Sequence, residues 1–367
     1  MIGLLEVRRR KVQFALITMV VTLIAYLVLM INGLGLGLNQ LAGSALRNLD
    51  ADAIAYSDSA DLSVIRSELG QETVDRIQWA GGVEESATIG YVAANVRLGA
   101  DAIESAAFIG YDPGTIAEPK VIAGRTLSPG DSRAMLADKS FLKSTGLKVG
   151  DKVTVNLRLT VEEFTIQGEI DEGAFFFQPA VYILRETWRE LKYGPAQDGQ
   201  PVASVVLLKG DGLTGLREDG FRAVSKDTAF ANIEGVAGQQ STVSALRVFG
   251  FLIGALVIGV FFYVLTLQKI GQIGMLKALG ASGFYVFRQV LAQVLAVSIA
   301  GVAIAVPLAW ATGKALQQLP ETVPIAFNTN LFVVTSVALV ATGVIGALFS
   351  GKQVAGVDPI IALGQQQ

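Results

Sequence analysis

The chain has 367 residues, is 51% hydrophobic and has a mean hydropathy of +0.50, which is too apolar for an ordinary soluble protein. It contains no cysteine and no histidine, which excludes disulfides, thiol catalysis, Ser-His-Asp triads and histidine-based metal sites. The net charge of −3 is unevenly distributed along the chain. Acidic residues outnumber basic ones by ten between residues 33 and 246, and basic residues outnumber acidic ones by seven elsewhere. An acidic middle between basic, apolar ends predicts a water-exposed domain held between membrane anchors and argues against nucleic-acid binding.

Four segments are apolar over the roughly 20 residues that a helix needs to cross a bilayer: residues 12–31, 248–267, 287–310 and 331–349. Basic residues orient them: Arg8, Arg9, Arg10 and Lys11 precede the first span, Lys269, Lys277 and Arg288 lie between the second and third, and Lys352 follows the fourth. The opposite loop, 312–330, holds only Lys314 and Glu321. We therefore expect a multi-pass protein of the inner (plasma) membrane with both termini in the cytoplasm.

The first span could instead belong to a cleaved signal peptide, whose apolar core is about 7–15 residues long and is followed by small residues. Here the apolar stretch is longer and continues through Gly33, Gly35 and Gly37 to Leu41. We therefore expect an uncleaved anchor that extends outward as a helical stalk. The three glycines do not complete a dinucleotide-binding fingerprint.

The predicted fold is an α-helical membrane protein with four transmembrane helices and a large α/β extracytoplasmic domain inserted between the first and second. The expected segments are a cytoplasmic N-terminus at 1–11, the first helix and stalk at 12–43, the extracytoplasmic domain at 44–240, a second stalk and helix at 241–267, a cytoplasmic coupling helix at 268–286, the third helix at 287–311, an external loop at 312–330, the fourth helix at 331–350 and a cytoplasmic tail at 351–367.

The extracytoplasmic domain combines short strand and helix patterns. Runs rich in β-branched residues and bounded by Gly, Pro and Asp predict strands at 52–56, 88–98, 106–111, 152–159, 164–169 and 202–208. Helices are predicted at 63–68, 72–78, 138–144 and 185–191. Two subdomains are expected at this size, and helices near 231–246 should lead into the second span without a linker.

The connector at 268–282 is the most informative segment, because it joins two membrane spans through one short amphipathic helix. We place a ladder of apolar side chains on one face of this helix: Ile270, Ile273, Leu276 and Leu279. Gly271 and Gly274 leave part of its surface without side chains. Lys269 and Lys277 mark the cytoplasmic side. Such a helix is suited to docking on a mobile soluble partner. The alternative is an ordinary basic connector.

Four other motifs of the chain have simple structural interpretations beside functional ones. Residues 346–352 have Walker A spacing, but Gln353 stands where Mg²⁺ ligation needs Ser or Thr, so we expect no ATP hydrolysis by this chain. Gly250 and Gly254 form a GxxxG pair that suits helix packing within one chain or between two. Glu84–Glu85 and Glu162–Glu163 fit a solvated face better than acid–base catalysis. Of Phe175, Phe176 and Phe177, at least one is expected to face a partner chain or an apolar ligand.

The connector resembles a known family. Residues 271–282 (GQIGMLKALGAS) are similar to the "EIGLLKALGAS" stretch of MacB/FtsX-type ABC transporter permeases, with Gln272 in place of the family's common Glu. Residues 146–153 (GLKVGDKV) with 164–168 (FTIQG) resemble the family's external-domain pattern, and 357–363 (VDPIIAL) resemble its terminal tail. The first span and residues 48–68 look most like the DevC and haem-exporter (HrtB-like) branch.

The resemblance implies a permease that pairs with itself and with two copies of a separate ABC ATPase. It implies coupling through Ile270, Ile273, Gly274, Met275, Leu276, Lys277 and Leu279. It also implies mechanotransmission, in which ATP-driven closure pushes the connector and the stalk moves the outer domain. A periplasmic adaptor is a further candidate partner.

The leading hypothesis is an export permease, not itself an enzyme, that extrudes a hydrophobic or amphipathic substrate such as haem. The alternatives are an FtsX-like signal transmitter that controls an external cell-wall hydrolase, and a membrane-bound enzyme or sensor. No catalytic residue, metal site or cofactor is predicted. If haem is the substrate, its iron must be held without His or Cys, and the candidate ligands are Met30 and Glu234.

Overall fold

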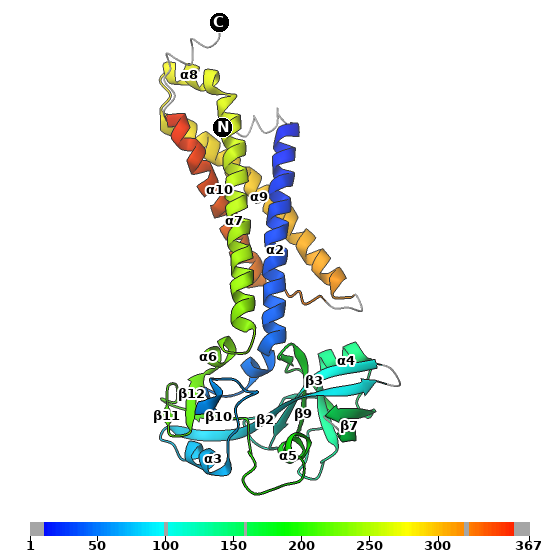
Figure 1. Ribbon diagram of the computed structural model, residues 1–367. Coiled ribbons are helices and arrows are strands. Elements are labelled where there is room, and N and C mark those ends of the chain that lie inside the picture. The colour runs from blue at the N-terminus through cyan, green and yellow to red at the C-terminus, as the bar shows by residue number, and fades with distance from the viewer. Residues whose placement is uncertain (1–10, 99–101, 158–159, 319–322, 356–367) are drawn as a thin grey trace. The chain divides into compact units, whose positions relative to one another are not determined.

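The computed structural model describes residues 11–98, 102–157, 160–318 and 323–355, and the expected cytoplasmic N-terminus before Lys11, Glu321 and the terminal tail lie outside them. The chain divides into two compact units. The membrane unit contains Met1–Gly37 and Gln240–Gln367, and the β-rich unit contains Leu38–Gln239. Figure 1 shows the helices of the first and the strands of the second.

The membrane unit contains the four predicted spans. Its long helices are α2 (Lys11–Asn48), α7 (Val236–Leu267), α9 (Gly283–Leu316) and α10 (Thr329–Ala355), of which α2 and α7 continue into the β-rich unit. All four are long and apolar enough to cross a membrane. The short helix α8 (Ile270–Ala278) joins α7 to α9 and lies at an angle to α7 beyond its end (Figure 1).

Glycines let the membrane helices approach one another closely. A Cβ atom on Gly250 would lie 2.8 Å from Val28 of α2, and one on Gly254 would lie 3.3 Å from Ile24 of the same helix. The GxxxG pair of α7 therefore packs against α2 of its own chain. Gly346 of α10 leaves similar room, because its Cβ would lie 2.3 Å from the carbonyl oxygen of Ala255. The glycine of the Walker-like spacing thus has a packing role.

The alternating glycines of α2 also have a packing role. A Cβ on Gly37 would lie 2.0 Å from the carbonyl oxygen of Pro324, and one on Gly33 would lie 2.4 Å from the ring of Phe327. Gly35, between them, faces α7, where its Cβ would lie 2.7 Å from Val243. The helix therefore accepts a loop on one side and a helix on the other only because these positions lack side chains.

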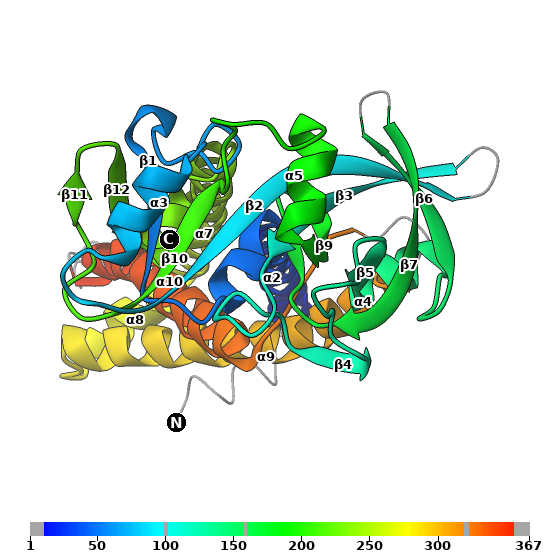
Figure 2. The same cartoon turned by 90° about the horizontal axis from the view of Figure 1, so that it is seen from below.

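The β-rich unit is built on one twelve-stranded sheet (Figure 2). Its strands are β1 (Ala53–Ser57), β2 (Val83–Leu98), β3 (Ala102–Tyr111), β4 (Val121–Gly124), β5 (Ala134–Asp138), β6 (Lys152–Leu157), β7 (Thr160–Ile170), β8 (Ala174–Phe175), β9 (Gln178–Leu184), β10 (Val205–Gly210), β11 (Arg217–Glu218) and β12 (Phe221–Ser225). The hydrogen-bonded order is β11-β12-β1-β10-β2-β3-β9-β5-β7-β4, with β6 pairing β2 and β7 and β8 pairing β9. The sheet joins the two expected subdomains into one structure.

Short helices cover parts of this sheet: α3 (Gln71–Gln78), α4 (Lys139–Thr145), α5 (Arg185–Tyr193) and α6 (Lys226–Ala231). The indole of Trp188 on α5 is fully buried against two glycines that face each other across β2 and β3, Gly90 and Gly110. A bulkier residue at either position would meet this ring. The glycine pair therefore allows α5 to lie directly on the sheet (Figure 2).

The helix expected at 63–68 is wrong. Asp61 and Leu62 have φ values of 49° and 60°, which turn the chain away from helical geometry, and residues 64–66 form a turn. Polar side chains then stabilise the irregular path, because the Ser67 hydroxyl accepts a hydrogen bond from the Ser57 amide at 3.0 Å. Serine hydroxyls that bond to the backbone compete with helix formation in this way.

Candidate functional sites

The first candidate site is the connector helix α8, which is bounded on both sides by non-helical residues. Gly280, with a φ of 94°, ends the helical path, and the Ser282 hydroxyl then caps α9 by accepting a hydrogen bond from the Tyr285 amide at 3.2 Å. Within α8, Gly274 is buried. The side chains of Ile273, Leu276 and Lys277 lie outside what the structure describes, so their coupling role stays a prediction.

Ideal helical geometry does not place the four positions of the predicted ladder on one face of α8. Steps of three residues turn a helix through 300° each, so the four ladder positions fan over 180° of the circumference and do not share one face. Leu279 also follows the last residue of α8, although its amide still donates to the Met275 carbonyl at 3.0 Å. Among the described side chains of this segment, Gln272, Met275 (55% exposed) and Leu279 (81% exposed) are exposed. Their spacing of three and four residues places them within about 60° of one another.

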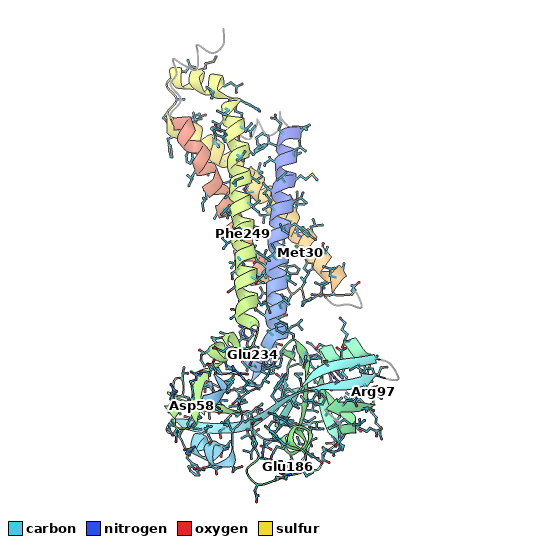
Figure 3. All side chains as sticks on the ribbon, viewed as in Figure 1. Met30, Asp58, Arg97, Glu186, Glu234 and Phe249 are labelled. Atoms are coloured by element: carbon cyan, nitrogen blue, oxygen red, sulfur yellow. The ribbon has the colours of Figure 1, made fainter. Side chains whose placement is uncertain are left out.

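The two candidate haem ligands lie in different compact units (Figure 3). Met30 of α2 is partly buried and packs with an apolar cluster of the membrane unit. Glu234, in the turn before α7, is exposed and accepts a hydrogen bond from the Ser63 hydroxyl. Burial, and then the negative charge of Glu234, raises the pKa of the nearby Tyr56 and Tyr91 hydroxyls. A shared role for Met30 and Glu234 in substrate binding stays a prediction.

The end of α2 that belongs to the β-rich unit is held by a hairpin. Helical geometry is interrupted at Gly43 (φ −172°, ψ 39°). The carbonyl of Ala42 accepts a hydrogen bond from the Phe176 amide at 3.0 Å, and that of Leu41 accepts one from the Phe177 amide at 2.9 Å. Immediately after Gly43, the Ser44 hydroxyl accepts a hydrogen bond from the Ala174 amide at 2.8 Å. The carbonyl groups that the interruption would leave unpaired are thus satisfied.

The three adjacent phenylalanines divide between core and surface. Phe175 is 4% exposed and meets the ring of Tyr91 edge to face at 5.3 Å between centroids. Phe176 is partly buried, and Phe177 is 40% exposed. Phe176 and Phe177 form the β8–β9 turn and have φ values of 50° and 62°, which is unusual for large side chains. This agrees with the expectation that not all three rings enter one core.

A polar bridge inside the membrane unit was not anticipated from the sequence. The Nε atom of Arg247 on α7 donates to Oδ1 of Asn32 on α2 at 2.5 Å, and Nδ2 of Asn32 donates to Oγ1 of Thr335 on α10 at 3.0 Å. Asn32 and Thr335 are each 5% exposed, whereas Arg247 is exposed. In the sequence, the only sign of this bridge is that Asn32 and Arg247 lie at the edges of apolar spans. Polar groups at such positions are costly and are commonly functional.

A groove also lies within the membrane unit, between the first half of α2 and α9. It has a volume of about 520 Å³ and is lined by Lys11, Phe14, Ala15, Thr18, Met19, Thr22, Leu23 and Ile304. One charged and two hydroxyl-bearing side chains thus lie among apolar ones. In the described residues, no cluster of three or more acidic side chains is arranged to hold a metal ion.

Comparison with known proteins identifies relatives over nearly the whole chain. Residues 244–359 match the family described as FtsX-like permease C-terminal. A putative hemin transport system permease protein, HrtB, from Staphylococcus haemolyticus is 26% identical over 361 residues, which cover 98% of this chain and 97% of that protein. A macrolide export ATP-binding/permease protein, MacB, from Shewanella oneidensis is 24% identical over 147 residues, which cover 40% of this chain and 22% of that protein.

Among solved structures, the periplasmic region of MacB from Actinobacillus actinomycetemcomitans is 14% identical and covers 51% of this chain and 94% of that chain. The TM-score is 0.36, which is too low to support an inference. The family match and the relatives in sequence agree with the four apolar helices and with the connector motif. The chain therefore carries an FtsX-like permease domain and is homologous to the HrtB and MacB permeases.

Proposed function

We propose that this chain is the permease subunit of an ABC exporter whose ATPase is a separate chain that docks on α8. The observation that carries the proposal is the exposed face formed by Gln272, Met275 and Leu279 on a short helix between two membrane spans. Burying a large apolar side chain contributes about 1.5–3 kcal/mol. Two such side chains on a surface that faces water therefore favour a protein partner.

Charge supports a cytoplasmic location for this face. Lys269 precedes α8 and Arg288 lies in the first turns of α9, and basic residues gather on the cytoplasmic side of membrane proteins. Both termini are then cytoplasmic and the β-rich unit is extracytoplasmic. In this arrangement α2 and α7 connect the ATPase side of the membrane to the β-rich unit, which suits the transmission of ATPase motion.

The substrate class is proposed to be a hydrophobic or amphipathic molecule, with haem as one candidate because the HrtB relative is described as a hemin transport permease. The groove beside Lys11 favours export over pure signal transmission, because a transmitter has no need of a cavity in its membrane unit. A homodimer is part of the proposal, since a permease of this kind must pair with two ATPase copies.

The docking surface can be tested by placing a charge in it. Met275→Asp and Leu279→Asp should each abolish co-purification with the partner ABC ATPase, because an unpaired carboxylate would be buried in the interface. Gln318→Asp, on an exposed side chain beyond the last residue of α9, is the matched control and should leave co-purification unchanged. Gln272→Glu should also be tolerated, since the family stretch that the connector resembles has Glu at this position.

The readouts are the amount of ATPase retained on the tagged permease and the ATPase activity of the complex in nanodiscs. Membrane insertion of every variant is checked by its yield in the membrane fraction. Normal retention and activity in both Met275→Asp and Leu279→Asp would refute docking through this face.

A further inference from the structure

Arg247 occupies a specific depth in the membrane unit. It immediately precedes the apolar stretch 248–267, and Asn32 immediately follows the apolar stretch 12–31. About 20 helical residues span about 30 Å, so the start of the α7 stretch and the connector α8 lie at opposite faces of the bilayer. The guanidinium group is therefore at the boundary between hydrocarbon and headgroups, on the side away from α8.

The buried amide of Asn32 fixes the direction of this guanidinium. Only the carbonyl oxygen of an amide can accept a hydrogen bond from Arg247, so Nδ2 must face Thr335, as observed. The hydrogen bond from Arg247 to Asn32 uses Nε, which lies on one edge of the planar guanidinium group. Within the described residues of the membrane unit, no hydrogen bond is made by Nη1 or Nη2 of Arg247. The outer edge of the fork thus remains available to an oxyanion.

The described part of the membrane unit offers no carboxylate to this arginine. Residues 11–37, 240–318 and 323–355, which are its described part, contain no Asp and no Glu. A guanidinium at the edge of the hydrocarbon layer has a strong electrostatic preference for an anion, because the low dielectric weakens screening. Packing alone would not require a charged group here, since an uncharged amide could bond to Asn32 equally well.

We propose that Nη1 and Nη2 of Arg247 bind the terminal oxyanion, a carboxylate or a phosphate, of an amphipathic molecule at the end of α7. A planar guanidinium matches two oxygens of such a group, which gives a bidentate contact. Leu246 and Phe249 of α7 (Phe249 is labelled in Figure 3) are 47% and 61% exposed and add apolar surface to this helix at the depth of Arg247, on other sides of its circumference. If the bound molecule is the exported one, this inference rests on the proposed function and narrows the substrate class to amphipathic carboxylates or phosphates.

Photolabelling can test the site without the ATPase. The full-length protein is placed in nanodiscs of unlabelled phosphatidylcholine and irradiated with one of three probes that carry the same diazirine chain: palmitic acid, its methyl ester, or phosphatidylcholine. Labelled peptides of α2 and α7 are quantified by mass spectrometry. The free acid should label residues near Arg247 about tenfold more than the ester, as expected for a hydrogen bond between charged groups.

Arg247→Gln should reduce labelling by the acid about tenfold, because the amide keeps the bond to Asn32 but loses the charge and the fork. Arg247→Lys should retain part of it, and Arg288→Gln, which removes a different arginine of the membrane unit, should have no effect. Arg-dependent labelling by the phosphatidylcholine probe alone would identify the ligand as a lipid phosphate and would still support the site. Labelling by both probes that is indifferent to Arg247→Gln and Arg247→Lys would overturn it. Because no ATPase is present, either result is independent of docking on α8.

Discussion

Replacing Gly90 by alanine should destabilise the β-rich unit, because the ring of Trp188 already fills the space. The new Cβ would lie 2.0 Å from Cδ2, 2.3 Å from Cε3 and 2.4 Å from Cε2 of the indole. Ordinary contacts between such atoms are about 3.5–4.0 Å, so the ring or the strand must move by more than about 1 Å. Trp188 is fully buried, and Gly110 on the neighbouring strand confines it further, because a Cβ there would lie 2.5 Å from the Trp188 Cβ.

The magnitude follows from these contacts. Overpacking a core costs about 1–3 kcal/mol, and losing the packing of a buried tryptophan costs about 3–5 kcal/mol. A cost of about 3 kcal/mol would lower the Tm of a unit of this size by about 6–12 °C. The assay is thermal unfolding of the full-length protein in detergent, followed by near-ultraviolet circular dichroism. Gly130→Ala is the control, since a Cβ at Gly130 would meet no heavy atom within 4 Å.

A double-mutant cycle makes the test sharper. Trp188→Leu removes the ring and leaves a cavity, which the added methyl group of Gly90→Ala would partly fill. The two substitutions together should therefore cost at least about 1 kcal/mol less than the sum of their separate effects. Additive effects, or a Tm for Gly90→Ala equal to that of Gly130→Ala, would refute the argument that the indole requires glycine at position 90.

Three further predictions concern other contacts. Gly37→Ala should reduce the fraction of protein that remains monodisperse in size-exclusion chromatography after heating, because its Cβ would lie 2.0 Å from the Pro324 carbonyl oxygen. Gly238→Ala is the control, since a Cβ there meets no heavy atom within 4 Å. Glu172 has a pKa above its ordinary value of 4.5, because of burial first and then the nearby Asp138 and Asp171. The protonated Glu172 side chain therefore contributes its full stability below pH 4.5, and this contribution is lost as pH rises through the elevated pKa. In Glu172→Gln the side chain cannot ionise, so the Tm should fall less over this pH range. The new amide oxygen can still accept the hydrogen bond from the Lys120 amide. Ser44→Ala should cost about 1 kcal/mol and accelerate amide hydrogen exchange at Ala174, because that amide loses its acceptor.

The membrane spans could be predicted from the sequence because bilayer thickness sets their length and apolar character. Several strands could be predicted because their sequences are rich in β-branched residues, as in β6, where Val153, Thr154 and Val155 follow one another. By contrast, β5 was missed. Its sequence, Ala-Met-Leu-Ala-Asp, has little intrinsic strand preference, and it is a strand because β7 and β9 pair with it on both sides. Only tertiary pairing supplies that information.

The candidate sites show the same limit. The connector helix was visible as a motif, but its exposed face is set by where α8 ends and by which side is buried at Gly274. A ladder read at intervals of three residues drifts around the helix, and only Leu279 of the four joins the described exposed face. The bond between Arg247 and Asn32 could not be predicted either, because 215 residues separate the two partners.

The end of α2 explains why a strained turn is retained in the β-rich unit. Phe176 and Phe177 both have left-handed backbone conformations, which cost about 1–2 kcal/mol per residue and would disfavour this hairpin on its own. The cost is offset because their amides pair with the carbonyl groups beside the Gly43 interruption, while Phe175 packs in the core against Tyr91. The turn therefore exists in this form only while the helix end is docked. A displacement of α2 at Leu41 that keeps the two hydrogen bonds must move the hairpin, and with it β9. A displacement that breaks the two hydrogen bonds leaves the strained turn without the contacts that offset its cost. The hairpin therefore links the end of α2 to β9 of the sheet through hydrogen bonds on both of its sides.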